Sequence, residues 1–447
     1  MTSQTTTAKP DAAADGSRPT DRLPIRELLR ISLYWLGLSS IFAGLNTILT
    51  GRLEFTGLVP ADQAGRALFA VEISGAIIAV LVQPTIGSIS DYTVSRWGRR
   101  KPYIFIGSLL DVVFLVGIAT SNTLLAIAAF IALLQFSSNL AQGPFQGYVP
   151  DLVPAEQVGL ASALVGLMQV LGNVAGFVIG GIAVATNNFA LGLVALAVLE
   201  LVTMLSVVIR VREGGRVKSR DGRSWRSVAA EAWGTDILRE HSFLWLVASR
   251  LAILMAGAVL IHLATFYLAR SMGLDQRDSG ITIIAVVGLV ALGTVIAVIP
   301  AGRMSDRVGR KPVIWSSCAI GAIGLATVAI APNLPVAFAG AFLYGLSAGI
   351  FVSVDWALMT DIIPKASSGR YMGLSNVATA SSGILAVALG GTVMDVVGGP
   401  EGPRAALWMA VGLMGLGALL LRPVREGRRE DAPPLAPAVA ISGQPAA

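Results

Sequence analysis

The chain has 447 residues, of which 54% are hydrophobic and only 13% are charged. Soluble globular domains carry about 25% charged residues, so this composition and the mean hydropathy of +0.71 exclude a protein with a fully water-exposed surface. The single cysteine, Cys318, excludes a disulfide framework. The net charge of +6 does not indicate nucleic-acid binding, because the basic residues lie in short segments between apolar stretches.

Residues 1–30 are rich in Thr, Ala, Asp and Ser without an apolar core, so they are predicted to be a disordered cytoplasmic tail rather than a signal peptide. A bilayer-spanning helix needs about 20 mostly apolar residues, and such stretches recur along the rest of the chain. The predicted spans are 31–50, 67–89, 103–120, 124–148, 160–185, 189–209, 243–268, 280–299, 313–331, 336–361, 371–394 and 405–421.

These spans predict an all-α membrane protein with about twelve transmembrane helices in two pseudo-symmetric halves. The N-terminal half is 31–209 and the C-terminal half is 243–421, joined by a cytoplasmic central loop over 210–242. Residues 422–447 are predicted to form a second disordered cytoplasmic tail.

The distribution of positive charge predicts the orientation of the spans. With both termini in the cytoplasm, 27 of the 33 Lys and Arg residues fall in cytoplasmic segments, 5 fall outside and one, Arg250, lies within a span. Cytoplasmic loops carry the excess of Lys and Arg in membrane proteins. We therefore expect a multi-pass protein of the cell (inner) membrane with both termini in the cytoplasm.

Two loop signatures occur once in each half, and equivalent positions such as Pro102 and Pro312, or Asp151 and Asp361, are 210 residues apart. This offset indicates a duplicated six-span unit. Transporters built from such repeats bind substrate near the bilayer midplane, between the halves. The signatures are Gly87-Ser-Ile-Ser-Asp91 with Gly98-Arg99-Arg100-Lys101-Pro102 and Asp151-Leu-Val-Pro154 with Gly159, matched by Gly302-Arg-Met-Ser-Asp306 with Gly309-Arg310-Lys311-Pro312 and Asp361-Ile-Ile-Pro364 with Gly369.

The first signature resembles the loop motif of the major facilitator superfamily, and the resemblance covers the whole membrane region. The stretch from Gln83-Pro84 to Pro102-Tyr103-Ile104 is also similar to sucrose transporters of the glycoside–pentoside–hexuronide:cation symporter group. The segment with Asn139 and Gln142-Gly143-Pro144 is similar to the same group of sucrose transporters. The resemblance implies the major facilitator fold and cation-coupled transport of a sugar or glycoside.

The sequence departs from the sucrose transporter group at two positions in the fourth span. The group usually has an acidic residue four positions before the matching Asn139 and an arginine two positions after the matching Pro144. This chain has Gln135 and Gln146 there. Since the resemblance links those residues to proton coupling and sugar binding, the departure leaves the coupling chemistry open.

The loop signatures predict a cytoplasmic gate. The family resemblance implies that Asp91 caps the start of the eleventh span and Asp306 the start of the fifth, where unpaired N–H groups and the helix dipole favour a carboxylate. Arginines of the same motif can bond to these carboxylates. The alternative is that these arginines only fix the orientation of the spans in the membrane. The predicted gate residues are Asp91, Gly98, Arg99, Arg100, Asp306, Gly309 and Arg310.

Ionisable residues inside spans are costly and are functional candidates by default. For substrate binding or coupling the sequence singles out Asp355, Glu72, Asp111 and Arg250, with structural ion pairs as the alternative. Arg250 needs a counter-ion if it is buried, and Asp355 and Glu200 are both possible partners. A structural role is favoured for His262 and Glu200. Uncharged candidates for a polar cavity are Asn46, Asn139 and Gln142, and the family resemblance adds Gln135 and Gln146 as substrate or coupling candidates.

Three functions remain open. The first is a proton- or cation-coupled carrier of a small polar solute such as a sugar or glycoside. The second is an exporter of amphipathic small molecules, and the third is a non-transporting assembly or pigment-delivery protein on the same fold. We expect a monomer in the lipid bilayer, no nucleic-acid partner, no cofactor, no metal and no catalytic residues, because no metal-spaced His/Cys set, nucleophile motif or P-loop occurs.

Overall fold

The computed structural model describes residues 21–90, 92–93, 95–154, 157–211, 213, 241–362 and 368–424. Over these residues the secondary structure is helical, without strands. Twelve of the helices are long, and eleven of these contain an apolar stretch long enough to cross a bilayer. The twelfth has a shorter apolar stretch, Ser381–Val397. The predicted fold class, a helical membrane protein with about twelve spans, is therefore confirmed.

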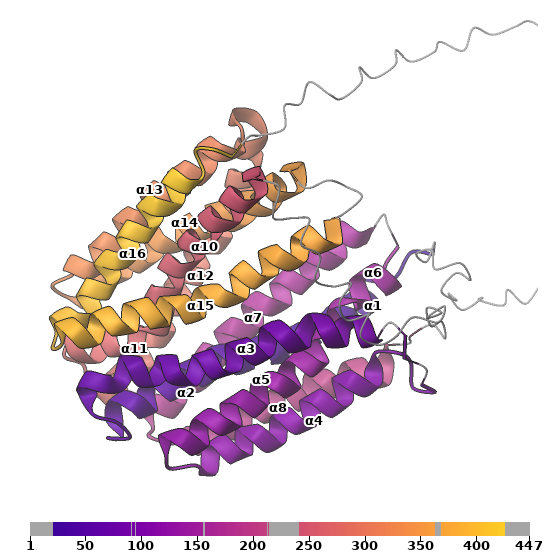
Figure 1. Cartoon of the computed structure of the whole chain (residues 1–447), viewed down its shortest axis with the longest axis horizontal. Coiled ribbons are helices and arrows are strands. Elements are labelled where there is room, and N and C mark those ends of the chain that lie inside the picture. The colour runs from indigo at the N-terminus through magenta and orange to yellow at the C-terminus, as the bar shows by residue number, and fades with distance from the viewer. Residues whose placement is uncertain are drawn as a thin grey trace, which may run out of the picture.

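Among its described residues, the N-terminal half has six long helices and three short ones (Figure 1, indigo to magenta). α2 packs against α7 and α8, α3 against α5, and α4 against α5 and α8. The elements are α1 (Ile25–Ser32), α2 (Tyr34–Phe55), η1 (Ala61–Gln63), α3 (Ala64–Ser90), α4 (Lys101–Thr120), α5 (Leu124–Gln146), α6 (Tyr148–Leu152), α7 (Val158–Ala185) and α8 (Phe189–Arg210).

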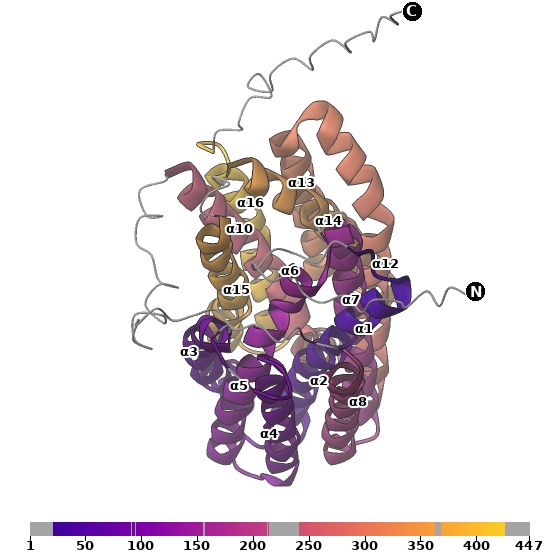
Figure 2. The same cartoon turned by 90° about the vertical axis from the view of Figure 1, so that its right-hand side faces the viewer.

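The C-terminal half repeats this arrangement (Figure 2, upper part of the view). α10 packs against α15 and α16, α12 against α14, and α13 against α14 and α16. The elements are α10 (His241–His262), α11 (Ala264–Phe266), the π-helical turn η4 (Tyr267–Ser271), α12 (Gln276–Val308), α13 (Arg310–Ile330), α14 (Leu334–Ile362), α15 (Ser368–Val397) and α16 (Glu401–Leu420).

The predicted seventh span, 243–268, is not one continuous helix. α10 ends at His262, and Leu263, with φ −100° and ψ 6°, separates it from the short α11. A π-helical turn then follows. No proline or glycine marks this break in the sequence, so hydropathy alone did not reveal it.

The outer surface of the bundle is apolar, as a lipid-facing surface requires. Large hydrophobic side chains there are strongly exposed, for example Leu125 at 82% and Ile209 at 72%. A monomeric soluble protein rarely exposes extended apolar surface of this kind. The protein is therefore a multi-pass membrane protein.

The two halves meet along two helix pairs, α3 with α15 and α7 with α12; α3 and α15 run side by side in Figure 1. Glycines permit both contacts. A Cβ atom at Gly65 of α3 would lie 2.4 Å from the carbonyl oxygen of Gly391 on α15. A Cβ at Gly280 of α12 would lie 2.5 Å from the carbonyl oxygen of Gly181 on α7. Both distances are too short for any side chain, so the halves approach backbone to backbone.

These crossings lie at what we call the far end of the bundle, where α3 and α12 begin. Polar contacts between the halves accompany them. Arg270 donates to both carboxylate oxygens of Glu54, with Nη2 2.6 Å from Oε2. Asp395 accepts from the backbone N–H of Gly65 and of Arg66 at 3.1 and 2.9 Å, which caps the start of α3. The opposite end, where α3 ends and α4 begins, is called the basic end below.

Candidate functional site

A cavity of about 400 Å³ lies at the interface of the two halves. Helices α2, α3 and α5 of the N-terminal half form one wall, and α10 and α15 of the C-terminal half form the other. We call this cavity the polar lobe, because amide, carboxyl, imidazole and hydroxyl groups line it. They belong to Asn46, Glu72, Gln83, Gln135, Asn139, Gln142, His262, Thr379 and Ser382.

Three of the predicted amide residues share one face of α5. Gln135, Asn139 and Gln142 follow each other at intervals of four and three residues, which places their side chains on one side of a helix. All three line the polar lobe. The Asn139 Nδ2 group donates to the Gln135 carbonyl oxygen at 2.7 Å, which fixes the direction of its amide. Gln146, predicted with them, is exposed at the end of α5 and does not line this cavity.

Glu72 and His262 join the two halves across the cavity. The Nδ1 atom of His262 on α10 lies 3.2 Å from Oε1 of Glu72 on α3, and the side chains are 26% and 17% exposed. The contact is an ion pair when the imidazole is protonated and a hydrogen bond when it is neutral. Sequence reasoning favoured a structural role for His262 because it is an isolated histidine in an apolar helix. The structure places its ring in the cavity wall.

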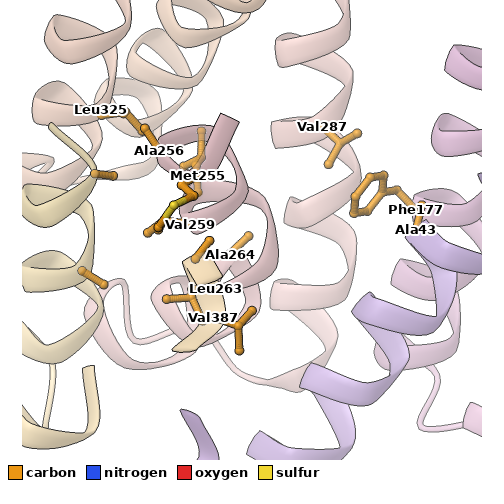
Figure 3. Close-up of a cluster of buried hydrophobic side chains, with 14 of the residues drawn as sticks. Ala43, Phe177, Met255, Ala256, Val259, Leu263, Ala264, Val287, Leu325 and Val387 are labelled. Carbon is orange, nitrogen blue, oxygen red and sulfur yellow. The ribbon is translucent and has the colours of Figure 1, made fainter. Parts of the chain in front are cut away.

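A second cavity of about 380 Å³ adjoins the first and shares Phe42, Asn46 and His262 with it. We call it the apolar lobe. Phe177 of α7 points towards Val287 of α12 across this space, with Ala43 of α2 beside it (Figure 3). The remaining lining is also mainly apolar, and consists of Val170, Asn173, Val174, Ile261, Val290, Ala291 and Thr294.

Asn46 lies between the two lobes. Its Oδ1 atom is buried and has no hydrogen-bond partner among the described residues. A buried acceptor without a donor costs about 1–3 kcal/mol, so such atoms in native proteins need an explanation. The atom is therefore available to accept a hydrogen bond from a hydroxyl or amide group placed in the cavity.

Arg250 and Asp355 form a buried ion pair between α10 and α14. Their side chains are 5% and 2% exposed, and Nη1 of Arg250 contacts Oδ2 of Asp355. Of the two partners that the sequence allowed for Arg250, the structure therefore selects Asp355. Nη2 of Arg250 also donates to Oγ1 of Thr379 at 3.0 Å, and Thr379 lines the polar lobe. The pair thus lies directly behind the cavity wall.

Asp111 lies within the N-terminal half, away from both lobes. Its side chain is fully buried and accepts hydrogen bonds from Ser137 and from Ser138, the latter at 2.8 Å. The ion pair expected as its structural alternative does not form with any described residue; its ionisable neighbour is Glu200, a second acid. The physical reason is that the contact between α4 and α8 brings the two carboxyl groups together.

The arginines predicted to belong to the gate of the first half, Arg99 and Arg100, lie in a polar cluster at the basic end. Arg99 and Arg100 both bind the carboxylate of Asp151, the latter with Nε 2.7 Å from Oδ2. The Arg100 backbone N–H donates to Glu213 at 2.9 Å, and the hydroxyl of Tyr148 donates to the same carboxylate at 2.5 Å. Burial and the neighbouring Glu213 raise the pKa of Tyr148, so its hydroxyl remains a donor at neutral pH.

The motif glycines adopt a conformation that other residues rarely adopt. Gly98 and Gly309 have φ values of 115° and 98°, and they occupy equivalent positions in the two halves. In the second half, Arg310 donates to Oγ of Ser305 at 2.6 Å. Asp91 lies outside the described residues, as does the side chain of Asp306, so the predicted pairing of these carboxylates stays a prediction.

Two features of this site were not predicted. Glu213 lies in the polar segment after α8, and its contact with Arg100 depends on the path of the chain beyond the span. The apolar lobe is lined mainly by Val, Phe, Ile and Ala residues, which in the sequence look like any other lipid-facing or core residue. The pair of Glu54 and Arg270 carried a weak signal, since both are charged residues close to predicted span ends.

The sequence profile of the Major Facilitator Superfamily matches residues 31–293 and 265–444. The chain belongs to this superfamily. A solved relative in fold is a D-xylose–proton symporter, with a TM-score of 0.68 and 16% identity over 89% of this chain and 98% of that one. The superfamily and the solved structures matched are membrane transporters rather than enzymes, in agreement with the sequence-based expectation.

Curated relatives in the superfamily match only part of the chain. The minor myo-inositol transporter IolF of Bacillus subtilis is 26% identical over 136 residues, which is 30% of each chain. The sucrose transport protein SUT1 of Oryza sativa subsp. japonica is 30% identical over 139 residues, 26% of this chain and 25% of the relative. The chain thus matches less than a third of the length of these relatives.

Proposed function

We propose that this protein is a secondary active transporter that carries a small polar solute, such as a sugar or glycoside, by alternating access. The observation that carries the proposal is the polar lobe between the two halves, with the unpartnered Asn46 acceptor in its wall. Amide groups both donate to and accept from solute hydroxyls, and a carboxylate accepts from them. The printed names of two relatives, a myo-inositol transporter and a sucrose transport protein, support a polyhydroxylated solute.

In this proposal the basic end faces the cytoplasm of the cell (inner) membrane, both termini lie on that side, and the protein acts as a monomer. The far-end contacts then close the outer side of the cavity. Glu54 with Arg270, and Glu72 with His262, are contacts between the halves that break when the cavity opens outwards. The predicted cytoplasmic gate of Asp91, Asp306 and their arginines forms as the far end opens. A proton or another cation provides the driving force.

Solute binding is tested by the thermal stability of the purified protein in the presence of sugars, glycosides and polyols at two pH values. A ligand at 100 times its Kd stabilises the folded state by about 2.7 kcal/mol. We expect a polyhydroxylated ligand to stabilise the wild type, and the effect to disappear in Gln135→Ala. The matched control is Gln146→Ala, which changes the same residue type in the same helix outside the cavity and is expected to keep the response.

A second candidate function, export of amphipathic molecules, is favoured by one observation. The apolar lobe is nearly as large as the polar lobe and opens from it at Asn46 and His262. The same stability assay therefore includes amphipathic amines and apolar alcohols. Stabilisation by these compounds and by none of the polyhydroxylated ones contradicts the sugar proposal and selects export. A lack of any response across both panels contradicts both and leaves the assembly role.

A further inference from the structure

Two carboxyl groups face each other in the interior of the N-terminal half, outside both lobes of the cavity. Asp111 projects from α4 and Glu200 from α8, and both side chains have zero exposed surface. They lie within hydrogen-bonding range of each other. Ten residues of α4 precede Asp111 and ten residues of α8 follow Glu200, so both lie in the middle of their spans.

Hydroxyl groups surround the pair. Oγ of Ser137 and of Ser138 on α5 both donate to Asp111. The Tyr34 hydroxyl on α2 lies 3.1 Å from Oε1 of Glu200 and 2.5 Å from Oγ of Ser108 on α4. Tyr34 is the only further titratable group that faces the pair among the described residues. None of the described Lys, Arg or His side chains forms an ion pair with either acid.

This arrangement requires a bound proton. Two adjacent carboxylates without a cation repel each other, and burial adds the cost of desolvating both charges. Oε2 of Glu200 is buried, and no described donor reaches it. A proton on Glu200 removes one charge and turns that atom into a donor to the facing Asp111. One proton therefore gives Oε2 a hydrogen-bond partner and also removes the repulsion between the two carboxylates.

The hydroxyl contacts indicate which acid carries the proton. Asp111 accepts two hydroxyl hydrogen bonds, which stabilise a carboxylate. Glu200 has the Tyr34 hydroxyl 3.1 Å from Oε1, whereas its Oε2 has no hydrogen-bond partner among the described residues. Glu200 is thus the protonated partner and Asp111 the ionised one, although a closely coupled pair titrates as a unit.

We propose that Asp111 and Glu200 form a proton-binding site, separate from the solute cavity, which releases and takes up one proton in each transport cycle. This inference rests on the transport function proposed above and names its coupling ion. Release breaks the O–H bond of Glu200, passes the proton to water and leaves two carboxylates. Uptake from water on the other side of the membrane restores the bond.

The helices around the pair connect it to the cavity. α5 carries Ser138, which bonds to Asp111, next to Asn139, which lines the polar lobe. α2 carries Tyr34 as well as Asn46. Gly37 on α2 approaches α8 so closely that a Cβ there would lie 2.9 Å from Cα of Glu200. Movement of α2 or α5 on solute binding therefore changes the hydroxyl bonds that decide where the proton resides.

Infrared difference spectroscopy of the reconstituted protein tests the site directly, because a protonated carboxylic acid has a carbonyl band that a carboxylate lacks. We expect a band that disappears as the pH is raised and is lost in Glu200→Gln. The matched control is Glu401→Gln, which removes an exposed glutamate at the start of α16 and is expected to keep the band. A wild-type spectrum without a titrating band, or a band unaffected by Glu200→Gln, overturns the proposal.

Transport assays distinguish a proton that is released and taken up in each transport cycle from one that stays bound throughout. Glutamine mimics protonated Glu200, so Glu200→Gln is expected to lose solute accumulation driven by a proton gradient and to keep solute-for-solute exchange. Unchanged accumulation in this variant means that the proton is structural and overturns the proposal. If Glu200→Gln does not fold, Tyr34→Phe removes one hydroxyl and keeps the ring. It is expected to shift the titration of the carbonyl band, and an unshifted titration contradicts the assigned site.

The two proposals fail in different ways. A wild-type protein that transports no solute but shows a titrating Glu200 band contradicts the carrier function and the coupling role, and leaves proton binding intact. A protein that accumulates solute without a titrating Glu200 band contradicts the proton site alone.

Discussion

Replacing Arg250 by alanine is expected to destabilise the protein by about 3–5 kcal/mol, the usual cost of removing one partner of a buried ion pair. Asp355 is only 2% exposed and lies inside the C-terminal half, so it keeps a buried charge without its guanidinium partner. The loss is measured as the fall in the thermal midpoint of the purified protein. Asp355→Ala is expected to have a similar effect, because it leaves the arginine charge behind.

The double variant Arg250→Ala/Asp355→Ala is the control. Removing both charges removes the unbalanced one, so the double variant is expected to be more stable than either single variant. The interaction energy from this cycle measures the pair itself. Additive losses in the double variant contradict a direct ion pair between α10 and α14.

Replacing Gly280 by alanine is expected to prevent the far end from closing. The added Cβ would lie 2.5 Å from the Gly181 carbonyl oxygen and 2.5 Å from the Ala185 backbone nitrogen, and these backbone atoms cannot move aside as a side chain does. Overpacking of this kind costs about 1–3 kcal/mol in the state that contains the contact. A free-energy difference of that size shifts a two-state equilibrium by roughly 5- to 150-fold.

Alternating access then gives a clear result for Gly280→Ala. The population with an open far end rises, probes attached near Glu54 and Arg270 move apart, and the rate of transport falls. Gly288→Ala is the matched control, since it makes the same change in α12 where no atom lies within 4 Å of the new Cβ. Equal behaviour of the two variants contradicts the far-end crossing as the closing surface.

The fold and the internal repeat could be predicted from the sequence because both depend on patterns that recur along the chain. Apolar stretches of about 20 residues mark the spans, and the offset of 210 residues between Pro102 and Pro312 marks the duplication. The cavity-lining face of α5 was also accessible, because the spacing of Gln135, Asn139 and Gln142 fixes a common side of the helix. Glu72 stood out for its charge within a span.

The remaining features depend on which helices are neighbours, and a single sequence does not state this. Asp111 was a candidate for the cavity, yet it faces Glu200 because α4 packs on α8 rather than on the opposite half. His262 looked structural because it is isolated along its helix, while its partner Glu72 comes from another half. The break after His262 has no Pro or Gly signal either.

The central claim, a solute cavity that opens to one side of the membrane at a time, is tested most directly by thiol labelling at Gln142. Cys318 is the only cysteine and is buried, so the variant Cys318→Ala with Gln142→Cys carries one reactive thiol in the polar lobe. Membrane-impermeant reagents are added from each side of reconstituted vesicles, with and without the solute identified by the stability assay. We predict labelling from either side, protection by the solute, and a change in the favoured side with Gly280→Ala. Labelling from one side only under every condition contradicts alternating access through this cavity.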